Sequence, residues 1–347
     1  LPETYVIFIT EAFLRASAFD FIWSDKAHNI LRAVLLAIII VKYVSGWIEH
    51  GLKDIPKVLI LGVIVLALAA SRFFNDVGSF IDAGLLLLAL RDIDLKKLLK
   101  VFLLTTAILL ALAMIAALTW NIENYTSYHG MTERYAFGTL SAIDFAAYFF
   151  YIEMVWFALR RNRIRYFEFG IIAVVIAALI ILCNARTSAA VMAAALIAAF
   201  ILKLRSRSME KRNISKPLLP LWLLFAGAAL ILIFAAFIIL ATYRYSPESG
   251  LFTLLDRVLN RRLLLGKYGM DEYGFSLFGR MVETVGVPGT ADYFFIDSSF
   301  VFILLRYGIV TLVGVLAVFQ ISAFHAAVKR DSWMVVILAF IALQSVM

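Results

Sequence analysis

The segment LLPLWLLFAGAALILIFAAFIILA, residues 218–241, carries no charged side chain and decides the class of protein. A helix needs roughly 20 apolar residues to cross about 30 Å of hydrocarbon, and this segment is long enough. Comparable runs recur along the whole chain of 347 residues, which is 63% hydrophobic and 16% charged. That composition is too apolar for a water-soluble domain. We therefore expect an integral membrane protein.

The apolar runs predict an all-α, polytopic helix bundle of about eleven transmembrane helices that forms a single membrane domain, residues 1–347. One long loop, residues 242–296, joins the ninth and tenth spans, and we expect the functional site there. No cleavable signal peptide is expected, because the first span lacks a basic start and a small-residue cleavage site. The predicted spans are 5–22, 29–48, 57–72, 77–90, 99–119, 136–158, 166–184, 187–203, 218–241, 297–323 and 333 onward.

The short basic linkers predict the orientation of these spans. They all fall on one side of the membrane, and the positive-inside rule makes that side cytoplasmic. The opposite, outer side then carries residues 120–135, the turn at 184–186 and the long loop. The basic linkers are DLKKLLK (94–100), RRNRIR (160–165), KLRSRSMEKRNISK (203–216) and VKRD (328–331).

The long outer loop contains a cationic stretch, LDRVLNRRLLLGKYG, at residues 255–269. The positive-inside rule predicts few such charges on this side, so they need a local reason. Helical spacing from residue 251 separates an apolar face from a polar one and leaves Arg262 at the flank. The apolar face holds Leu251, Leu254, Leu255, Val258 and Leu259, and the opposite face holds Arg257, Asn260 and Arg261.

Two interpretations of this cationic stretch stay open. The first is an interfacial helix whose arginines reach lipid head groups. The second is a phosphate site, since the planar fork of arginine binds phosphate oxygens in pairs, and a cluster near a low-dielectric boundary favours a diphosphate. The two are compatible, because a lipid-linked diphosphate would arrive in the plane of the same leaflet.

Other outer segments also contain arginine. Arg134 precedes the sixth span in TERYAFGTL, Arg186 lies in the turn CNARTS, and Arg280 ends YGFSLFGR. Each could be structural by itself; Arg186, for example, could bond the carbonyls at the end of the seventh helix. Arginines in several separate outer segments are better explained by one shared anionic ligand.

Acidic residues suggest further roles at the tenth span, which opens with FFIDSSFVFILLRYG. Asp297, Ser298 and Ser299 fit an N-cap, yet an aspartate beside a cationic cluster is also a candidate general base. Deeper in the same helix, Arg306 is expected to pair within the bundle. Its expected partners are Asp144 or Glu153, and a second internal network is expected from Glu11, Arg15 and Asp82.

Several kinds of chemistry find no support in the sequence. The four histidines are scattered without metal-ligand spacing, and Cys183 is the single cysteine. There is no nucleophile elbow, phosphate loop or dinucleotide fingerprint, so no metal, cofactor or nucleic-acid partner is expected. A secondary transporter remains an alternative, although the chain lacks the internal repeat that such folds commonly carry.

Two late blocks resemble the Wzy-type polymerases of oligosaccharide repeat units, in the wider group that includes O-antigen ligases. LNRRLLLGKYGMDEYGFSLFG is similar to the family's pattern of Leu, Ser or Thr, Gly, Arg, a hydrophobic stretch, Gly, then Tyr-Gly-Phe-x-Leu-Phe-Gly. YFFIDSSFVFILLRYGIV resembles its signature at the start of the next helix, and ERYAFGTLSAIDFAAYF and NARTSAA resemble its arginine-containing middle segments.

Asn260 and Arg261 stand where the family has a small residue and Gly, so only Arg262 matches the motif arginine. Asp297 stands where ligases tend to have His, which favours a polymerase of a capsular or exopolysaccharide pathway.

The resemblance implies an enzyme of the bacterial cytoplasmic membrane whose active site faces outside. Such an enzyme transfers a glycan linked to undecaprenyl diphosphate onto the non-reducing end of another lipid-linked repeat unit. This substrate is both donor and acceptor, the lipid diphosphate leaves, and neither a nucleotide nor a metal is required. A chain-length regulator and a flippase of the same pathway are its implied partners, besides the lipid bilayer.

The resemblance also implies roles for individual residues. Arg262, Arg186 and Arg134 would bind the donor diphosphate, and Asp297 would orient or deprotonate the acceptor hydroxyl, which gives inversion at the anomeric carbon. Three further arginines would bind the second diphosphate or hold the loop: Arg257, Arg261 and Arg280. An O-antigen ligase with a different acceptor, and a transporter or flippase of an anionic lipid-linked substrate, remain the alternatives.

Overall fold

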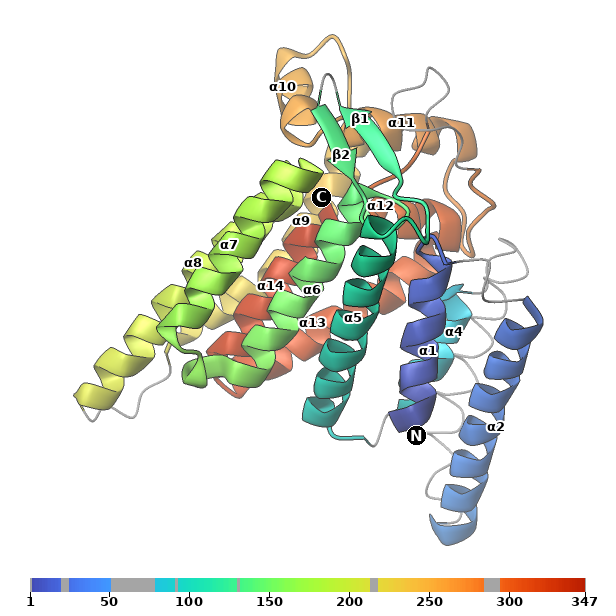
Figure 1. The fold of residues 1–347 in the computed structure, drawn as a ribbon, viewed down its shortest axis with the longest axis vertical. Coiled ribbons are helices and arrows are strands. Elements are labelled where there is room, and N and C mark those ends of the chain that lie inside the picture. The colour runs from blue at the N-terminus through green and yellow to red at the C-terminus, as the bar shows by residue number, and fades with distance from the viewer. Residues whose placement is uncertain are drawn as a thin grey trace.

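The computed structural model describes residues 2–19, 25–50, 79–90, 93–129, 132–212, 218–283 and 294–346, and these are mostly helical, as predicted (Figure 1). A two-stranded hairpin, β1 (Thr126–His129) and β2 (Thr132–Tyr135), was not predicted. The helices are α1 (Pro2–Arg15), α2 (Asp25–His50), α4 (Ser79–Leu90), α5 (Leu95–Leu118), α6 (Ala142–Arg160), η3 (Arg161–Arg163), α7 (Tyr166–Cys183), α8 (Arg186–Lys211), α9 (Leu221–Tyr243), α10 (Gly250–Val258), α11 (Arg262–Tyr273), α12 (Ser299–Phe302), η4 (Ile303–Tyr307), α13 (Gly308–Val328) and α14 (Ser332–Val346).

Six helical segments among the described residues are long and apolar enough to cross a membrane, in agreement with the prediction of a membrane protein. They do not reach the predicted count of eleven, and the predicted span 57–72 lies outside the described residues. Asn29–Val41 and Ser332–Val346 are shorter apolar helices. The six segments are Leu95–Leu118, Ala142–Arg163, Tyr166–Cys183, Arg186–Lys211, Leu221–Tyr243 and Ser299–Val328.

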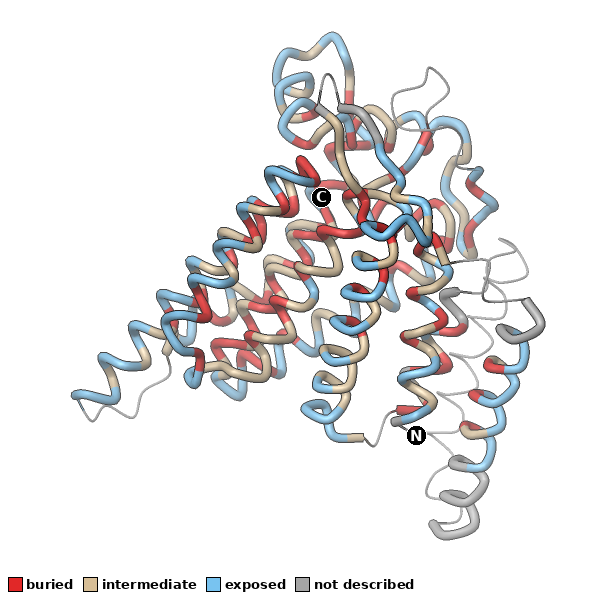
Figure 2. Tube along the Cα trace, viewed as in Figure 1, coloured by how far each residue is buried: buried red, intermediate tan, exposed pale blue. Residues whose placement is uncertain are grey.

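Helix α14 joins the two largest packed regions of the bundle. Trp333 and Ile337 pack with α5 to α8, whereas Val335 and Ala342 pack with α9, α11, α12 and α13. Figure 2 shows buried positions along these inner faces and exposed positions on the outer ones. Many of the exposed side chains are large and apolar, including Ile181 of α7. Such an outward-facing apolar surface is what hydrocarbon would cover.

The bundle has two chemically different ends (Figure 1). The end that carries β1, β2, α10 and α11 is called the hairpin end. The opposite end carries η3 and the C-terminal part of α8 and is called the basic end. Contacts between turns hold the basic end together: Arg161 pairs with Asp331 at 3.0 Å, and Trp333 Nε1 donates to Asn162 Oδ1 at 2.7 Å.

Three predicted boundaries differ from the structure. The sixth span was expected from residue 136, but α6 begins at Ala142, because Ser141 caps it by accepting from Asp144 N–H at 3.1 Å. The eighth was expected to end at 203, but α8 continues to Lys211. The predicted loop 242–296 contains the last turn of α9 and two helices, α10 and α11; its residues 284–293 lie outside the described residues.

The tenth predicted span is a broken helix. Ser299–Phe302 is α-helical, Ile303–Tyr307 is π-helical, and Gly308 leaves the helical region with a φ of +88° before α13 continues. The segment YGFSLFG runs alongside this break: Ile309 N–H donates to Ser276 O at 3.0 Å and Val310 N–H to Leu277 O at 3.1 Å. Irregular backbone at membrane depth is tolerated where other protein segments satisfy it.

The internal acidic network differs in one partner from the prediction. Glu11 pairs with Arg15 at 3.0 Å along α1, as expected. Asp82 of α4 pairs instead with Arg32 of α2, whose Nε lies 2.6 Å from Asp82 Oδ1. The sequence pattern did not single out Arg32, because its partner is 50 residues away along the chain.

We predict that Gly279→Ala disrupts the junction at the helix break. Gly279 has a φ of +90°, and a Cβ there would lie 2.0 Å from the carbonyl oxygen of Arg306. Left-handed strain and the overlap together should lower stability by about 2 kcal/mol or more, which is measured as a lower melting temperature in detergent. Gly314→Ala in α13 is the matched control, because nothing lies within 4 Å of its Cβ position. Equal melting of the two variants would contradict this account.

Candidate functional site

The cationic stretch folds as two helices joined by a sharp turn, not as the single helix that its spacing predicted. Helix α10 ends at Val258, and Asn260 and Arg261 take left-handed backbone conformations with φ of +55° and +67°. Asp256, which is buried, accepts hydrogen bonds from Leu263 N–H at 2.8 Å and Leu264 N–H at 3.0 Å. This carboxylate lies outside α11 and caps its first turn. It therefore fixes the start of α11 at Arg262.

Arg262 is directed into the protein beside Asp297. Its side chain is only 1% exposed, and its Nε lies 3.9 Å from Asp297 Oδ2. That separation allows an ion pair but is too long for a hydrogen bond. A second nitrogen of the same guanidinium group, Nη1, donates to Leu259 O at 3.1 Å. The structure therefore brings together the two predicted catalytic residues from α11 and from the segment before α12.

Asp297 does not cap the helix that follows it. The N-cap of α12 is Ser298, whose side chain makes no capping hydrogen bond. The hydroxyl of Ser298 instead donates to Ser345 O of α14 at 3.5 Å. The capping interpretation of Asp297 is therefore wrong, and its carboxylate, 14% exposed, faces Arg262.

Burial raises the pKa of Asp297 above its ordinary value of 3.8, because a carboxylate loses hydration when it is buried. The positive charge of Arg262 opposes this rise, and that of Arg134 opposes it more weakly. The negative charge of Asp144 adds to the rise. These effects place Arg134 of β2 and Asp144 of α6 within electrostatic reach of the pair, at the hairpin end.

Asp144 belongs to this charged group, although it was predicted to lie inside the bundle as a partner of Arg306. Its Oδ2 accepts from the hydroxyl of Ser141 at 2.7 Å, one turn from the helix start. The pattern Ser-Ala-Ile-Asp is a capping sequence, and this signal could have placed Asp144 in the first turn of α6 from the sequence alone. Arg306 instead donates to Val282 O and lies over the ring of Phe302 at 5.8 Å.

Glu153, the other expected partner of Arg306, lies within α6 and is buried. Neither of its carboxylate oxygens has a hydrogen-bond partner among the described residues. The expected pair with Arg306 is therefore wrong. The π-helical segment and the break at Gly308 direct Arg306 toward the chain at Val282, and this local geometry is not encoded in residue spacing.

Arg134 and Arg186 contact the same turn, but Arg134 makes the carbonyl contacts that the sequence suggested for Arg186. Arg134 bonds the carbonyls at the end of α7, with Nε to Cys183 O at 3.0 Å and NH2 to Asn184 O at 3.1 Å. Arg186 was expected there; its Nε donates to Asn184 Oδ1 at 2.8 Å, and it remains exposed. Both arginines thus meet the turn between α7 and α8 at the hairpin end.

The remaining arginines lie on α10, on the turn after it and beside the end of α11. Arg257 and Arg261 are exposed on α10 and its turn. Arg280 donates through NH1 to Tyr273 O at 2.8 Å, which satisfies a carbonyl at the end of α11. On α10, Leu254 and Val258 are also exposed, as an interfacial helix requires.

Comparisons with known proteins give no further constraint on this site. No protein-family profile, curated protein or solved structure matches the chain. Within the parts of the chain that the structure describes, no group of three or more His, Cys, Asp or Glu could hold a metal ion. The charged group itself offers carboxylates and guanidinium groups. A carboxylate can accept a proton and guanidinium groups can stabilise an anion.

We predict that Asp256→Ala loosens the α10–α11 turn. Two backbone N–H groups lose a buried, charged acceptor, which should cost about 1 to 3 kcal/mol. Faster proteolytic cleavage between α10 and α11, together with a lower melting temperature, would measure this loss. Asp271→Ala is the control: its carboxylate is 62% exposed and pairs with Lys267 within α11 at 2.7 Å, so its loss should cost less than about 0.5 kcal/mol. Identical cleavage of both variants would rule out the capping role.

Proposed function

We propose that this protein is a metal-independent glycosyltransferase that polymerises oligosaccharide repeat units carried on a lipid diphosphate, as the resemblance to Wzy-type polymerases implies. The observation that supports it is the buried Arg262–Asp297 pair, 3.9 Å apart, at the end of a bundle of membrane-length helices. An acid and several arginines gathered there match the needs of a reaction whose leaving group is a diphosphate.

The proposed reaction is a single displacement at the anomeric carbon of the donor. The acceptor hydroxyl forms the new C–O bond while the bond to the lipid diphosphate breaks, and the diphosphate leaves with the electron pair. Asp297 takes the hydroxyl proton. Positive charge develops on the sugar and negative charge on the diphosphate, so arginines held in place before the reaction stabilise the transition state more than the ground state.

The positions of the arginines suggest a division of work in this proposal. Arg186 is exposed and Arg134 partly so, and both can contact a donor diphosphate at the membrane surface. Arg262 is almost fully buried, so it acts on Asp297 and contributes positive charge from behind the reacting groups. Arg257 and Arg261, on the exposed side of α10, would bind the second lipid-linked unit or lipid head groups.

The membrane arrangement is part of the same proposal. We place the hairpin end on the outer face of a bacterial cytoplasmic membrane and the basic end in the cytoplasm, following the positive-inside rule. Helices α1 and α4, the two shorter apolar helices and the segment 57–72 would complete a bundle of about eleven spans, with residues 242–296 between the ninth and the tenth. Undecaprenyl-diphosphate-linked repeat units would then reach the site from the outer leaflet.

A secondary transporter or flippase is the second candidate, and one observation favours it. The segment Ser299–Val328 is a membrane-length helix broken by a π-helical turn and Gly308, and transporters build their ligand sites from broken helices. An O-antigen ligase differs from the polymerase only in its acceptor. Both alternatives are distinguished by the products of a reconstituted reaction.

The direct test is reconstitution of the purified protein with an undecaprenyl-diphosphate-linked repeat unit, without nucleotide or divalent metal. The proposal predicts a ladder of lipid-linked products at multiples of the repeat unit. No ladder from a cognate repeat unit would contradict it. A conjugate formed only when lipid A core is added would then indicate a ligase, and passage of the lipid across the vesicle membrane without reaction would indicate transport.

The pH profile of chain growth tests the role of the pair. Asp297 works as a base only when it is deprotonated, so the rate should rise with pH and level off above the ordinary Asp value of 3.8, because its pKa is raised. Arg262→Gln removes a charge that lowers this pKa, so the inflection should move to higher pH. Arg244→Gln removes one exposed charge near the end of α9 and should leave the inflection in place. An unchanged inflection in Arg262→Gln would refute the coupling.

Two further substitutions separate catalysis from structure. Asp297→Asn keeps the size of the side chain and removes the base, so chain growth should fall by about 100-fold or more while melting is unchanged or improved. The improvement would reflect the loss of a buried charge. Arg257→Gln with Arg261→Gln should weaken the contact of α10 with lipid head groups without abolishing turnover if α10 is an interfacial helix. Full activity of Asp297→Asn would remove it from the mechanism.

A further inference from the structure

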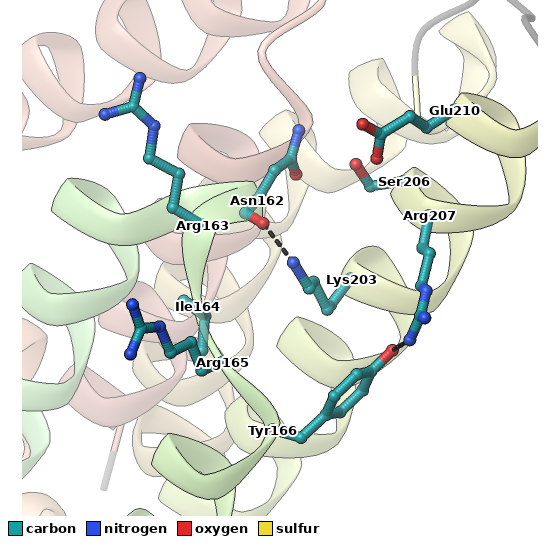
Figure 3. A pocket seen from close by; sticks show the side chains of 9 residues that line it. All are labelled: Asn162, Arg163, Ile164, Arg165, Tyr166, Lys203, Ser206, Arg207 and Glu210. Atoms are coloured by element: carbon teal, nitrogen blue, oxygen red, sulfur yellow. Dashed lines mark hydrogen bonds between the residues drawn. The ribbon is translucent and has the colours of Figure 1, made fainter.

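A second cationic site lies at the basic end, far along the helices from the Arg262–Asp297 pair. Here η3, the start of α7 and one face of α8 enclose a pocket of about 320 Å³. Its cationic side chains are Arg163, Arg165, Lys203 and Arg207, and Glu210 is its one acidic side chain among the lining residues (Figure 3).

The pocket is built by specific contacts. Lys203 and Arg207 lie one helical turn apart, so they share a face of α8. Lys203 donates to the carbonyl oxygen of Asn162, and Arg207 NH1 donates to the hydroxyl of Tyr166 at 3.1 Å. Figure 3 shows both side chains extending from α8 toward η3 and the start of α7. Their charged ends are thus held on one wall of the pocket, and no ion pair with a carboxylate links either of them to another described residue.

Neighbouring acids do not neutralise these charges. Glu168 lies at the start of α7, but its carboxylate is occupied by Arg160 at 2.6 Å and by Trp156 Nε1 at 2.8 Å. It also accepts from Arg165 N–H at 3.1 Å. Asp331 pairs with Arg161, and Arg161 does not line the pocket. Only Glu210, exposed one turn beyond Arg207, opposes the cations that line it.

The pocket sits where the apolar surface of the bundle ends. On α8, Ile197 and Ile201 are large, apolar and exposed, as are Phe167 and Ile171 on α7. Lys203 follows this band. With a rise of about 1.5 Å per residue, it lies roughly 25 Å along α8 from Arg186. A hydrocarbon layer of about 30 Å that covers the band therefore brings its head groups to the level of the pocket.

We propose that this pocket binds the phosphate of an anionic phospholipid in the leaflet at the basic end. A phosphate has the charge that the lining cations require, and a lipid brings it to this depth while its acyl chains lie along the exposed band of α7 and α8. Basic pockets between transmembrane helices are where anionic head groups bind. The exposed Arg163 and Arg165, whose guanidinium groups point away from α8 in Figure 3, close on the phosphate by rotation about their side-chain bonds.

Native mass spectrometry of the purified protein tests this site. Phosphatidylglycerol and the zwitterionic phosphatidylcholine are offered at equal concentration, and the bound lipid is counted. Wild-type protein should retain phosphatidylglycerol preferentially, and Lys203→Gln with Arg207→Gln should weaken that retention by roughly tenfold or more. The control, Arg205→Gln with Arg212→Gln, removes the same charge from the end of α8 outside the pocket and should retain it. Equal loss in both double variants would overturn the site.

Two further measurements keep the proposal falsifiable if the pocket variant folds poorly. In wild-type protein, the preference for phosphatidylglycerol should fall at 1 M salt, where the Debye length is about 3 Å; an absent preference at low salt overturns the proposal. Inorganic phosphate is titrated against bound phosphatidylglycerol. Displacement by millimolar phosphate would support the phosphate site but assign it to the free ion, and failure to displace would assign it to the lipid.

Discussion

The constraint on which the hairpin end depends is the cost of keeping an arginine and an aspartate out of water. A buried ion pair stabilises a protein only when geometry and further hydrogen bonds offset the desolvation of both charges. Arg262 and Asp297 are 3.9 Å apart, so their attraction offsets only part of that cost, and the pKa of Asp297 stays raised. Such a pair is poorly explained as a source of stability. Our proposal explains it instead as a site whose charges are completed by an anionic ligand.

The rest of the structure holds this pair in place. Asp256 fixes the start of α11, while the break at Gly308 and the close approach of Gly279 set the course of the chain after α12. Helix α14 packs between the two halves of the bundle and accepts the hydroxyl of Ser298 through Ser345 O. The charged residues therefore stand on packed helices and tight turns, which is how a site remains organised before its ligand arrives.

Hydrophobic runs were enough to predict a mostly helical membrane protein, because a long apolar segment has few stable alternatives to a buried or membrane-embedded helix. They could not predict the β1–β2 hairpin or the break at Gly308, which depend on turns and on packing between distant segments. In the site, the Arg262–Asp297 proximity was expected from the family resemblance. The contact of Arg134 with the carbonyls at the end of α7 was not expected, because Arg134 lies 49 residues before Cys183 and only tertiary packing brings them together. The capping pattern Ser-Ala-Ile-Asp is visible in the sequence. The apolar residues that follow it nevertheless led to the prediction that Asp144 lies inside the bundle.

The central claim is that the charged group at the hairpin end binds a lipid diphosphate. The most direct measurement is the affinity of the purified protein in lipid nanodiscs for a polyprenyl diphosphate compared with the corresponding monophosphate. The account predicts that wild-type protein and Arg244→Gln prefer the diphosphate equally, and that Arg186→Gln weakens its binding by roughly tenfold, as expected for the loss of a charge-assisted pair of hydrogen bonds. Equal affinity for both lipids, or equal affinity of all three proteins for the diphosphate, would contradict it.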